Sequence, residues 1–171
     1  MNEVIIREAT AADAFVIADL SHRTFYDTFA AVNTAANMDK FFAEQFRHED
    51  LVREVGLPGN IFLLVLRNNT PVGYTLLREG AYAAPGNTDA IEIVRIYLDK
   101  TEQGKGTGSM LMQYCIDLAV QLKKNIIWLG VWEHNTTAIA FYHRWGFEQV
   151  GSHVFMLGDD EQTDWLMKKE L

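Results

Sequence analysis

A glycine-rich run between two strongly patterned segments constrains this sequence more than any other feature. Residues 103–108 read Gln-Gly-Lys-Gly-Thr-Gly, between a β-branched segment at 90–98 and apolar residues at helical spacing over 111–122. Glycines let a backbone approach an anion closely, and the start of a helix carries a partial positive charge of about half a unit. A strand, a glycine turn and a helix start in this order predict a loop that holds a diphosphate.

The spacing of the run separates it from two other phosphate-binding loops. In a Walker A loop a serine or threonine follows the lysine, whereas Gly106 follows Lys105 here. The dinucleotide fingerprint has the spacing G-x-G-x-x-G near a first strand, but these glycines are spaced G-x-G-x-G and lie late in the chain. The spacing excludes a P-loop NTPase and disfavours a dinucleotide fold, and a glycine turn without a ligand remains the alternative.

The other segments alternate between strand-like and helix-like patterns. Residues Thr10 to Asp13 resemble a capping box that opens a helix, and the stretch 81–88, rich in Ala, Gly, Pro and Asn, reads as a loop. The predicted strands are 3–8, 61–66, 72–77, 90–98, 125–131, 147–156 and 163–169, and the predicted helices are 10–25, 38–46, 48–55, 107–122 and 135–145. With no repeat or linker, residues 1–171 are predicted to form a single domain around a mixed sheet.

Composition narrows the classes of partner. The formal charge is −8, and no Lys/Arg stripe interleaved with aromatic residues occurs, so we predict no nucleic-acid partner. The negative charge either attracts cations such as polyamines or serves solubility alone. No apolar run approaches the roughly 20 residues of a membrane span, and Met1 to Glu3 lack the layout of a secretory signal. The single Cys115 is predicted to be a buried apolar residue, and the five histidines show no metal-ligand spacing. We therefore predict a cytoplasmic protein without a metal or a membrane partner.

Three segments together carry a resemblance to a known family. The glycine run fits the pattern Q/R-x-x-G-x-G/A, residues 92–98 resemble a central strand, and 135–147 resemble a second cofactor segment. In these features the chain resembles the GCN5-related N-acetyltransferase (GNAT) superfamily. Residues 24–29, 128–133 and 156–164 also resemble the PaiA-type spermidine/spermine acetyltransferases. The resemblance implies an α/β fold of mixed α+β type, with a twisted, mostly antiparallel sheet of about seven strands and about four helices.

The resemblance also implies a cosubstrate, acetyl-coenzyme A (acetyl-CoA), and a set of residues that binds it. These residues lie on the central strand, on the glycine loop with the helix start after it, and on the helix at 135–145. They are Ile96, Tyr97, Leu98, Gln103, Gly104, Lys105, Gly106, Thr107, Gly108, Ser109, Asn135, Ala138 and Tyr142. Thr107, Gly108 and Ser109 are expected to offer N–H or hydroxyl donors to the diphosphate, while Lys105 either lies over its charge or is a solvated lysine.

Transfer of an acetyl group from a thioester to an amine requires a base, an oxyanion site and an acid. Glu92 is the candidate base, with an ion pair to a basic neighbour as the alternative interpretation. By resemblance Tyr142 is the acid that protonates the thiolate; without the resemblance, a packing role would be the default. A backbone N–H of residues 96–98, released by a bulge or splay, is expected at the oxyanion. Val94 stands where relatives can carry a second acid.

The expected acceptor is a small-molecule primary amine, and by resemblance a polyamine such as spermidine or spermine. Asp27 and Glu44 join Glu92 as candidate contacts for its positive charge. Two other functions remain open at this point. One is acetylation of a protein or peptide amine, and the other is a non-catalytic module that senses acetyl-CoA. The sequence leaves a homodimer open as well.

Overall fold

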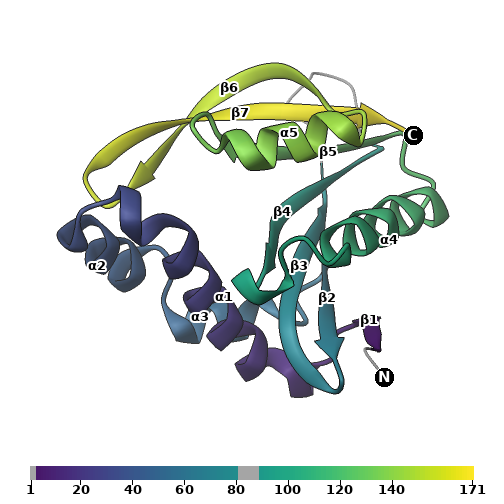
Figure 1. Cartoon of the computed structure of the whole chain (residues 1–171), viewed down its shortest axis with the longest axis horizontal. Helices are drawn as coiled ribbons and strands as arrows, with labels where there is room; N and C mark the ends of the chain where they lie inside the picture. The colour runs from purple at the N-terminus through teal and green to yellow at the C-terminus, as the bar shows by residue number, and fades with distance from the viewer. Residues whose placement is uncertain (1–2, 81–88) are drawn as a thin grey trace.

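The computed structural model describes residues 3–80 and 89–171, so the predicted loop at 81–88 lies outside the described residues (Figure 1). Its strands are β1 (Val4–Glu8), β2 (Asn60–Arg67), β3 (Thr70–Glu79), β4 (Ala90–Leu98), β5 (Ile126–Trp132), β6 (Glu148–Leu157) and β7 (Asp160–Glu170). Its helices are α1 (Ala14–Phe29), α2 (Ala35–Glu44), α3 (His48–Glu54), α4 (Thr107–Gln121) and α5 (Thr136–Arg144). Every predicted strand and helix outside 81–88 is therefore confirmed.

The seven strands form one sheet in the order β1-β2-β3-β4-β5-β7-β6. All neighbours are antiparallel except β4 and β5, which are parallel and are connected through α4. The mixed, mostly antiparallel sheet is as expected. The described part contains the five α-helices that the residue patterns predict, where the resemblance implies about four. The backbone is extended at Arg47, with ψ 141°, and this separates α3 from α2.

Helices cover both faces of the sheet and bury two apolar layers (Figure 1). On one face, α4 and α5 pack residues such as Leu111 and Ile139 against Ile91 and Ile127 of the central strands. On the other face, α1 packs Ile17 and Leu20 against side chains of β2 and β3. A separate cluster of aromatic side chains joins α1 to α2, and it accounts for the helical spacing of the Phe residues in the predicted helix at 38–46.

The pairing between β4 and β5 is short, and this shortness creates the opening in the sheet. Only four residue pairs join the two strands, from Ala90 opposite Ile126 to Ile93 opposite Leu129. From Gly130 onward β5 pairs with β7 alone within the described residues, while the rest of β4 stays paired to β3. The two strands therefore splay apart after their first halves (Figure 1).

A bulge in β4 coincides with the start of the splay. The register against β3 shifts between Leu76, opposite Arg95, and Leu77, opposite Ile93, so that Val94 is the extra residue. A bulge bends its strand and increases the local twist, which turns the second half of β4 away from β5. The predicted bulge or splay is present, although the bulge lies at Val94, before residues 96–98.

The turn between β6 and β7 is hydrogen-bonded to α2 and to the segment just before α2. Gly158, with φ +63°, lies directly against Asn37, whose side-chain oxygen accepts a hydrogen bond from the Asp159 N–H at 3.1 Å. The Gln162 amide donates to Asn33 Oδ1 at 2.7 Å. These contacts hold the long hairpin over the end of α1 and α2, as Figure 1 shows.

Candidate active site

The predicted diphosphate loop leads from the end of β4 to the start of α4. Gly104 and Gly106 have φ angles of +74° and +81°, which side chains rarely adopt, and Gly106 caps α4 in this left-handed conformation. A Cβ atom built at either glycine meets nothing within 4 Å. The loop surface at these glycines is therefore open, so a ligand can approach the backbone there.

The first turn of α4 presents hydrogen-bond donors without backbone partners. In the described part of the chain no backbone acceptor is recorded for the N–H groups of Thr107, Gly108 and Ser109, and the first intrahelical bond is from Met110 N to Gly106 O. Unpaired N–H groups at a helix start favour an anion. The predicted arrangement for a diphosphate is thus present.

A buried ion pair lies beneath the loop, and the sequence did not reveal it. Arg67, at the end of β2, contacts Glu102 with both prongs of its guanidinium, Nη2 to Oε2 at 2.6 Å and Nε to Oε1 at 2.9 Å. Glu102 is only 3% exposed. The hydrogen bond from Arg67 is the main reason that the pKa of Glu102 falls from 4.5 to about 2.

Thr107 joins this ion pair, which corrects one expectation. Its hydroxyl donates to Glu102 Oε2 at 2.7 Å and accepts from Arg67 Nη2 at 3.0 Å, and the side chain is fully buried. The hydroxyl of Thr107 is therefore not available to a diphosphate, and only its N–H remains a candidate donor. No local pattern marks the pair, because Arg67 and Glu102 are 35 residues apart in the sequence.

The remaining polar residues of the loop are exposed. Gln103 and Ser109 lie at the surface, and Lys105 is half exposed with its Nζ 3.6 Å from Glu102 Oε1. Lys105 therefore has an acidic neighbour in this structure and still reaches solvent.

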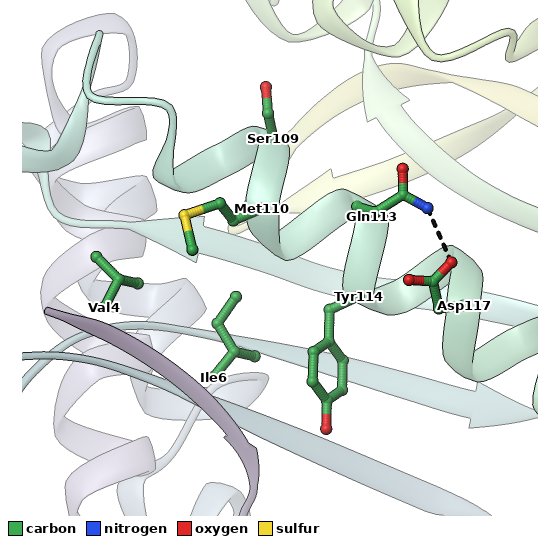
Figure 2. A pocket seen from close by; sticks show the side chains of 7 residues that line it. All are labelled: Val4, Ile6, Ser109, Met110, Gln113, Tyr114 and Asp117. Carbon is green, nitrogen blue, oxygen red and sulfur yellow. Dashed lines mark hydrogen bonds between the residues drawn. The ribbon is translucent and has the colours of Figure 1, made fainter.

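A cavity of about 560 Å³ adjoins this region on the side of α4 that faces β1. Figure 2 shows Met110 and Tyr114 pointing toward Val4 and Ile6, whereas the Ser109 hydroxyl points away from them. Ser109, one of the predicted donors, lies at the edge of this cavity, and the other lining residues belong to β1 and to later residues of α4. The open loop at Gly104 and Gly106 stays the predicted diphosphate site, and the cavity adjoins it along α4.

The splayed half of β4 supplies a second row of donors. The Asp99 N–H bonds Val72 O at 2.8 Å, which fixes the phase of the ladder between β3 and β4. Because hydrogen-bonding direction alternates along a strand, the N–H groups of Arg95 and Tyr97 point to β3 and those of Ile96 and Leu98 point to the opening. Residues 96–98 are the segment from which the sequence predicts the oxyanion donor.

The three predicted coenzyme segments meet at Gly108. A Cβ atom at Gly108 would lie 3.7 Å from a methyl group of Leu98 and 3.9 Å from the ring of Phe141. The end of β4, the start of α4 and the middle of α5 are thus in contact. Asn135 caps α5 as predicted, because its side-chain oxygen accepts from the Ala138 N–H at 3.3 Å.

Tyr142 lies on the buried side of α5. It is 8% exposed, and its ring packs 5.9 Å from that of Phe147. Burial raises the pKa of Tyr142, and the nearby Cys115 adds to the effect, so the phenol keeps its proton at neutral pH. A protonated phenol is the state that a proton donor requires. Cys115 itself is fully buried, as predicted, and burial raises the pKa of its thiol to about 12.

Glu92 lies in β4 immediately before the splay, opposite Arg78 on β3 and Trp128 on β5. Burial raises the pKa of Glu92, while the positive charges of Arg78 and His153 lower it in part. No hydrogen bond or ion pair of the Glu92 carboxylate occurs in the described part of the chain. The alternative of a simple ion pair with a basic neighbour is therefore not what the structure contains.

Asp27 and Glu44 are exposed, and no described contact joins either of them to Glu92. Asp27 lines a surface cavity of about 500 Å³ between α1 and α2, together with Asp19, His22, Arg23, Tyr26 and Phe42. Glu44, the last residue of α2, acts electrostatically on Lys40 one turn earlier in the same helix. The structure thus groups these two acids with the helices and not with the opening in the sheet.

Two further residues lie near the opening and were not singled out from the sequence. Asp164 on β7 and His153 on β6 are register partners, with His153 Nε2 3.7 Å from Asp164 Oδ2. Burial raises the pKa of Asp164, and His153 lowers it in part. The only sequence signal was that Asp164 ends the segment 156–164 that carries the narrower resemblance.

Residues 3–80 and 89–171 contain no group of three or more His, Cys, Asp or Glu side chains that could hold a metal ion. None of the helices in the same residues combines the length and the hydrophobicity that a membrane span requires.

Comparison with known proteins places this geometry in a family. The model of the acetyltransferase (GNAT) family matches residues 22–147. A protein of Lactobacillus delbrueckii subsp. lactis, named an uncharacterized N-acetyltransferase in the pepI 3′ region, is 36% identical over 172 residues that span 100% of this chain and 99% of that protein. A probable spermine N(1)-acetyltransferase of Bacillus subtilis subsp. natto is 38% identical over 62 residues, or 36% of this chain and 41% of that protein.

Solved structures agree on the fold. The PaiA N-acetyltransferase from Thermoplasma acidophilum, in complex with coenzyme A, superposes with a TM-score of 0.80 at 19% identity and covers 99% of both chains. YncA from Salmonella typhimurium, with its cofactor acetyl-CoA, gives a TM-score of 0.72 at 22% identity over 99% of this chain and 94% of that one. The chain therefore belongs to the acetyltransferase (GNAT) family, and it is an acetyl-CoA-dependent N-acetyltransferase.

Proposed function

We propose that this protein transfers the acetyl group of acetyl-CoA directly to a cationic primary amine, with a polyamine such as spermidine or spermine as the acceptor. The observation that carries the proposal is the meeting of an open helix start with a splayed strand. The free N–H groups of 107–109 and those of Ile96 and Leu98 lie on segments in contact at Gly108. One extended ligand with a diphosphate at one end and amides along its arm fits both rows of donors.

The residues of the opening then have distinct roles in the reaction. Glu92 accepts a proton from the acceptor ammonium, through water, and the neutral nitrogen attacks the thioester carbonyl carbon. A β4 N–H, from Ile96 or Leu98, donates to the oxyanion that forms. As the carbon–sulfur bond breaks, Tyr142 donates its phenolic proton to the thiolate. The nitrogen, positively charged after the attack, loses its second proton through water to the Tyr142 phenolate, and Glu92 releases the first proton to solvent. The products are the acetylated amine and coenzyme A.

Charge supports a cationic acceptor. The chain carries a formal charge of −8, and a negative protein surface raises the local concentration of cations. Glu92 lies partly buried in the opening without an ion pair among the described residues. One similar protein is named a probable spermine N(1)-acetyltransferase and another is named PaiA N-acetyltransferase. These features favour a polyamine over a neutral amine.

The first test is binding of coenzyme A, measured by calorimetry on the wild-type protein and on Gly106→Val. A side chain at Gly106 strains a backbone with φ +81° and stands between the loop and its ligand. We expect Gly106→Val to weaken coenzyme A at least tenfold. Gly56→Val is the matched control, since Gly56 has φ +95° in open space at the end of α3. Equal affinity of Gly106→Val and the wild type would refute the loop assignment.

The second test changes the proposed acid. Tyr142→Phe keeps the buried ring but removes the proton, so kcat should fall by about 10²–10⁴, the usual contribution of an acid or base, while the affinity for coenzyme A stays constant. Phe141→Leu at the neighbouring position is the control for packing, because Phe141 has no proton to give. A Tyr142→Phe enzyme as fast as the wild type would displace the proposed acid.

A second acceptor class has support of its own. A peptidyl-lysine N-acetyltransferase, YjaB of Salmonella typhimurium, is 31% identical over 111 residues, or 64% of this chain and 66% of that protein. Turnover of spermidine compared with that of lysine-containing peptides separates the two classes. Activity on peptides with none on any polyamine would replace the polyamine by a peptide acceptor. Coenzyme binding without turnover of either would favour the sensing module.

A further inference from the structure

We infer that Asp164, held by His153, binds a second positive charge of the acceptor, apart from the amine that is acetylated, and so selects diamines and polyamines. This inference deepens the proposed function and rests on it. It concerns a residue that determines specificity on the β7 side of the opening.

Strand register puts Asp164 on the same face of the sheet as Glu92. Glu92 is opposite Trp128, and Asp164 is opposite Trp132, four residues further along β5. Side chains alternate between the two faces of a strand, so residues 128, 130 and 132 of β5 share one face. Glu92 and Asp164 therefore flank the same surface of β5, one at each end.

The Asp164 carboxylate is poorly satisfied by the protein. Its side chain is only 18% exposed, and its one ion-pair neighbour in the described part of the chain is His153, at 3.7 Å. No hydrogen bond to this carboxylate is recorded among the same residues. A carboxylate has about four acceptor positions, and a partly buried one gains most from a charged donor. Asp164 thus retains acceptor positions that fit an ammonium group.

Gly130 keeps space open beside this carboxylate. A Cβ atom at Gly130 would lie 3.3 Å from His153 Cε1 and 3.7 Å from Asp164 Oδ2. The glycine itself is exposed. A larger residue at this position would press on His153, would contact Asp164 and would cover the surface of β5 between Glu92 and Asp164. The lack of a side chain therefore leaves the surface of β5 between Trp128 and Trp132 accessible, and we call this surface the strip.

The strip leads to the place of acetyl transfer. Burial is the main cause of the raised pKa of Tyr97 on β4, and Tyr142 and Asp164 both lie close enough to that phenol to add to the shift. On the other side, the Phe29 ring of α1 meets the Trp132 ring edge-on at 6.3 Å and encloses the end of the strip. An acceptor lying along β5 would thus have one end near Tyr142 and Glu92 and the other near Asp164.

Two small amines of similar length test the inference. 1,4-Diaminobutane carries a second ammonium group, and butylamine does not. We expect Asp164→Asn to lower kcat/KM for the diamine at least tenfold, mainly through KM, and to change kcat/KM for butylamine less than twofold. The affinity for coenzyme A should not change. Glu161→Gln, at an exposed site on the same strand, loses the same charge and should leave kcat/KM unaltered for both amines.

Gly130→Ala provides a second variant in case Asp164→Asn does not fold. Its Cβ narrows the strip without removing a charge, so KM for the diamine should rise several-fold at unchanged affinity for coenzyme A. Equal losses for diamine and butylamine in Asp164→Asn, or no loss for either, would overturn the inference while leaving the acetyltransferase assignment intact.

A direct binding measurement separates this inference from the proposed function. If the wild type acetylated no amine, the proposed function would fail, and calorimetric titration of 1,4-diaminobutane into the complex of the protein with coenzyme A would still test Asp164. Binding to the wild type that is lost in Asp164→Asn supports the residue's role. The same affinity in both proteins, or none in the wild type, refutes it.

Discussion

Arg67 and Glu102 form a two-pronged buried ion pair that joins the end of β2 to the residue before the diphosphate loop, with contacts of 2.6 and 2.9 Å. Thr107, the first residue of α4, is bonded to both partners. The pair thus fixes the two ends of the glycine loop relative to the sheet. Its geometry determines where the free N–H groups of α4 point, although neither charged side chain faces the loop's open surface.

Arg67→Lys is therefore expected to weaken coenzyme binding without touching the coenzyme. Lysine keeps the positive charge but loses the planar fork, so the contact with Glu102 and Thr107 becomes less rigid. We expect KM for acetyl-CoA to rise about tenfold. With S-acetylpantetheine, a donor without the diphosphate, kcat/KM should stay within twofold of the wild type.

Steady-state kinetics with the two donors measure this difference, and Arg53→Lys is the control because Arg53 is 75% exposed on α3. A general loss of stability would reduce activity with both donors alike. Parallel losses in Arg67→Lys would therefore contradict a role of the ion pair in positioning the loop.

The same ion pair gives stability a defined dependence on pH. The pKa of Glu102 is about 2 in the folded protein, below its ordinary 4.5, so its contribution is complete above pH 4.5 and disappears as the pH falls toward 2. Glu102→Gln leaves Arg67 without its partner and should cost about 3–5 kcal/mol of unfolding free energy at pH 7. Urea unfolding at several pH values should show the gap between the two proteins closing below pH 4. A gap independent of pH would argue against the ion pair as its source.

Activity should rise with pH through the raised pKa of Glu92. A base works only when deprotonated, and burial shifts this pKa upward while Arg78 and His153 oppose the shift. Glu92→Gln should lower kcat/KM by about 10²–10⁴ and remove this rise from the pH profile. Glu148→Gln, an exposed change at the start of β6, should retain both the rate and the profile. A Glu92→Gln profile that keeps its rising limb would assign the base elsewhere.

Gly158→Ala should destabilise the contact between the β6–β7 hairpin and α2. The new Cβ would lie 2.7 Å from Asn37 O, and the residue would also have to adopt φ +63°. Overpacking and left-handed strain together predict a loss of about 2–5 kcal/mol of unfolding free energy. Gly59→Ala has a similar φ of +83° with its nearest atom at 3.9 Å, so it should lose only about 1–2 kcal/mol. Denaturant unfolding of both variants measures the difference, and equal losses would rule out the steric contact.

The order of strands and helices could be predicted because each element is marked by local residues. Asn135 caps α5 and Gly106 begins α4 as their residue types suggest, and the alternation of apolar residues gives the strands. Contacts between distant residues left no such mark. The Arg67–Glu102 pair and the Asp164–His153 pair depend on strand register, which is set by the whole sheet. Thr107 was predicted to contact the diphosphate because of its place in the loop, but its buried hydroxyl bonds to Arg67 and Glu102 instead.

The short seam of four residue pairs between β4 and β5 has a consequence for the behaviour of the free protein. The sheet consists of two parts, β1 to β4 and β5 to β7, which are joined only by these four residue pairs. The amides of Ile96 and Leu98 therefore face water when no ligand lies between the two parts. Under the proposed function, coenzyme A, with amides along its arm, would take the place of a missing strand there. Hydrogen exchange at these two amides should therefore be fast in the free protein and slow in the complex, which makes them internal reporters of occupancy.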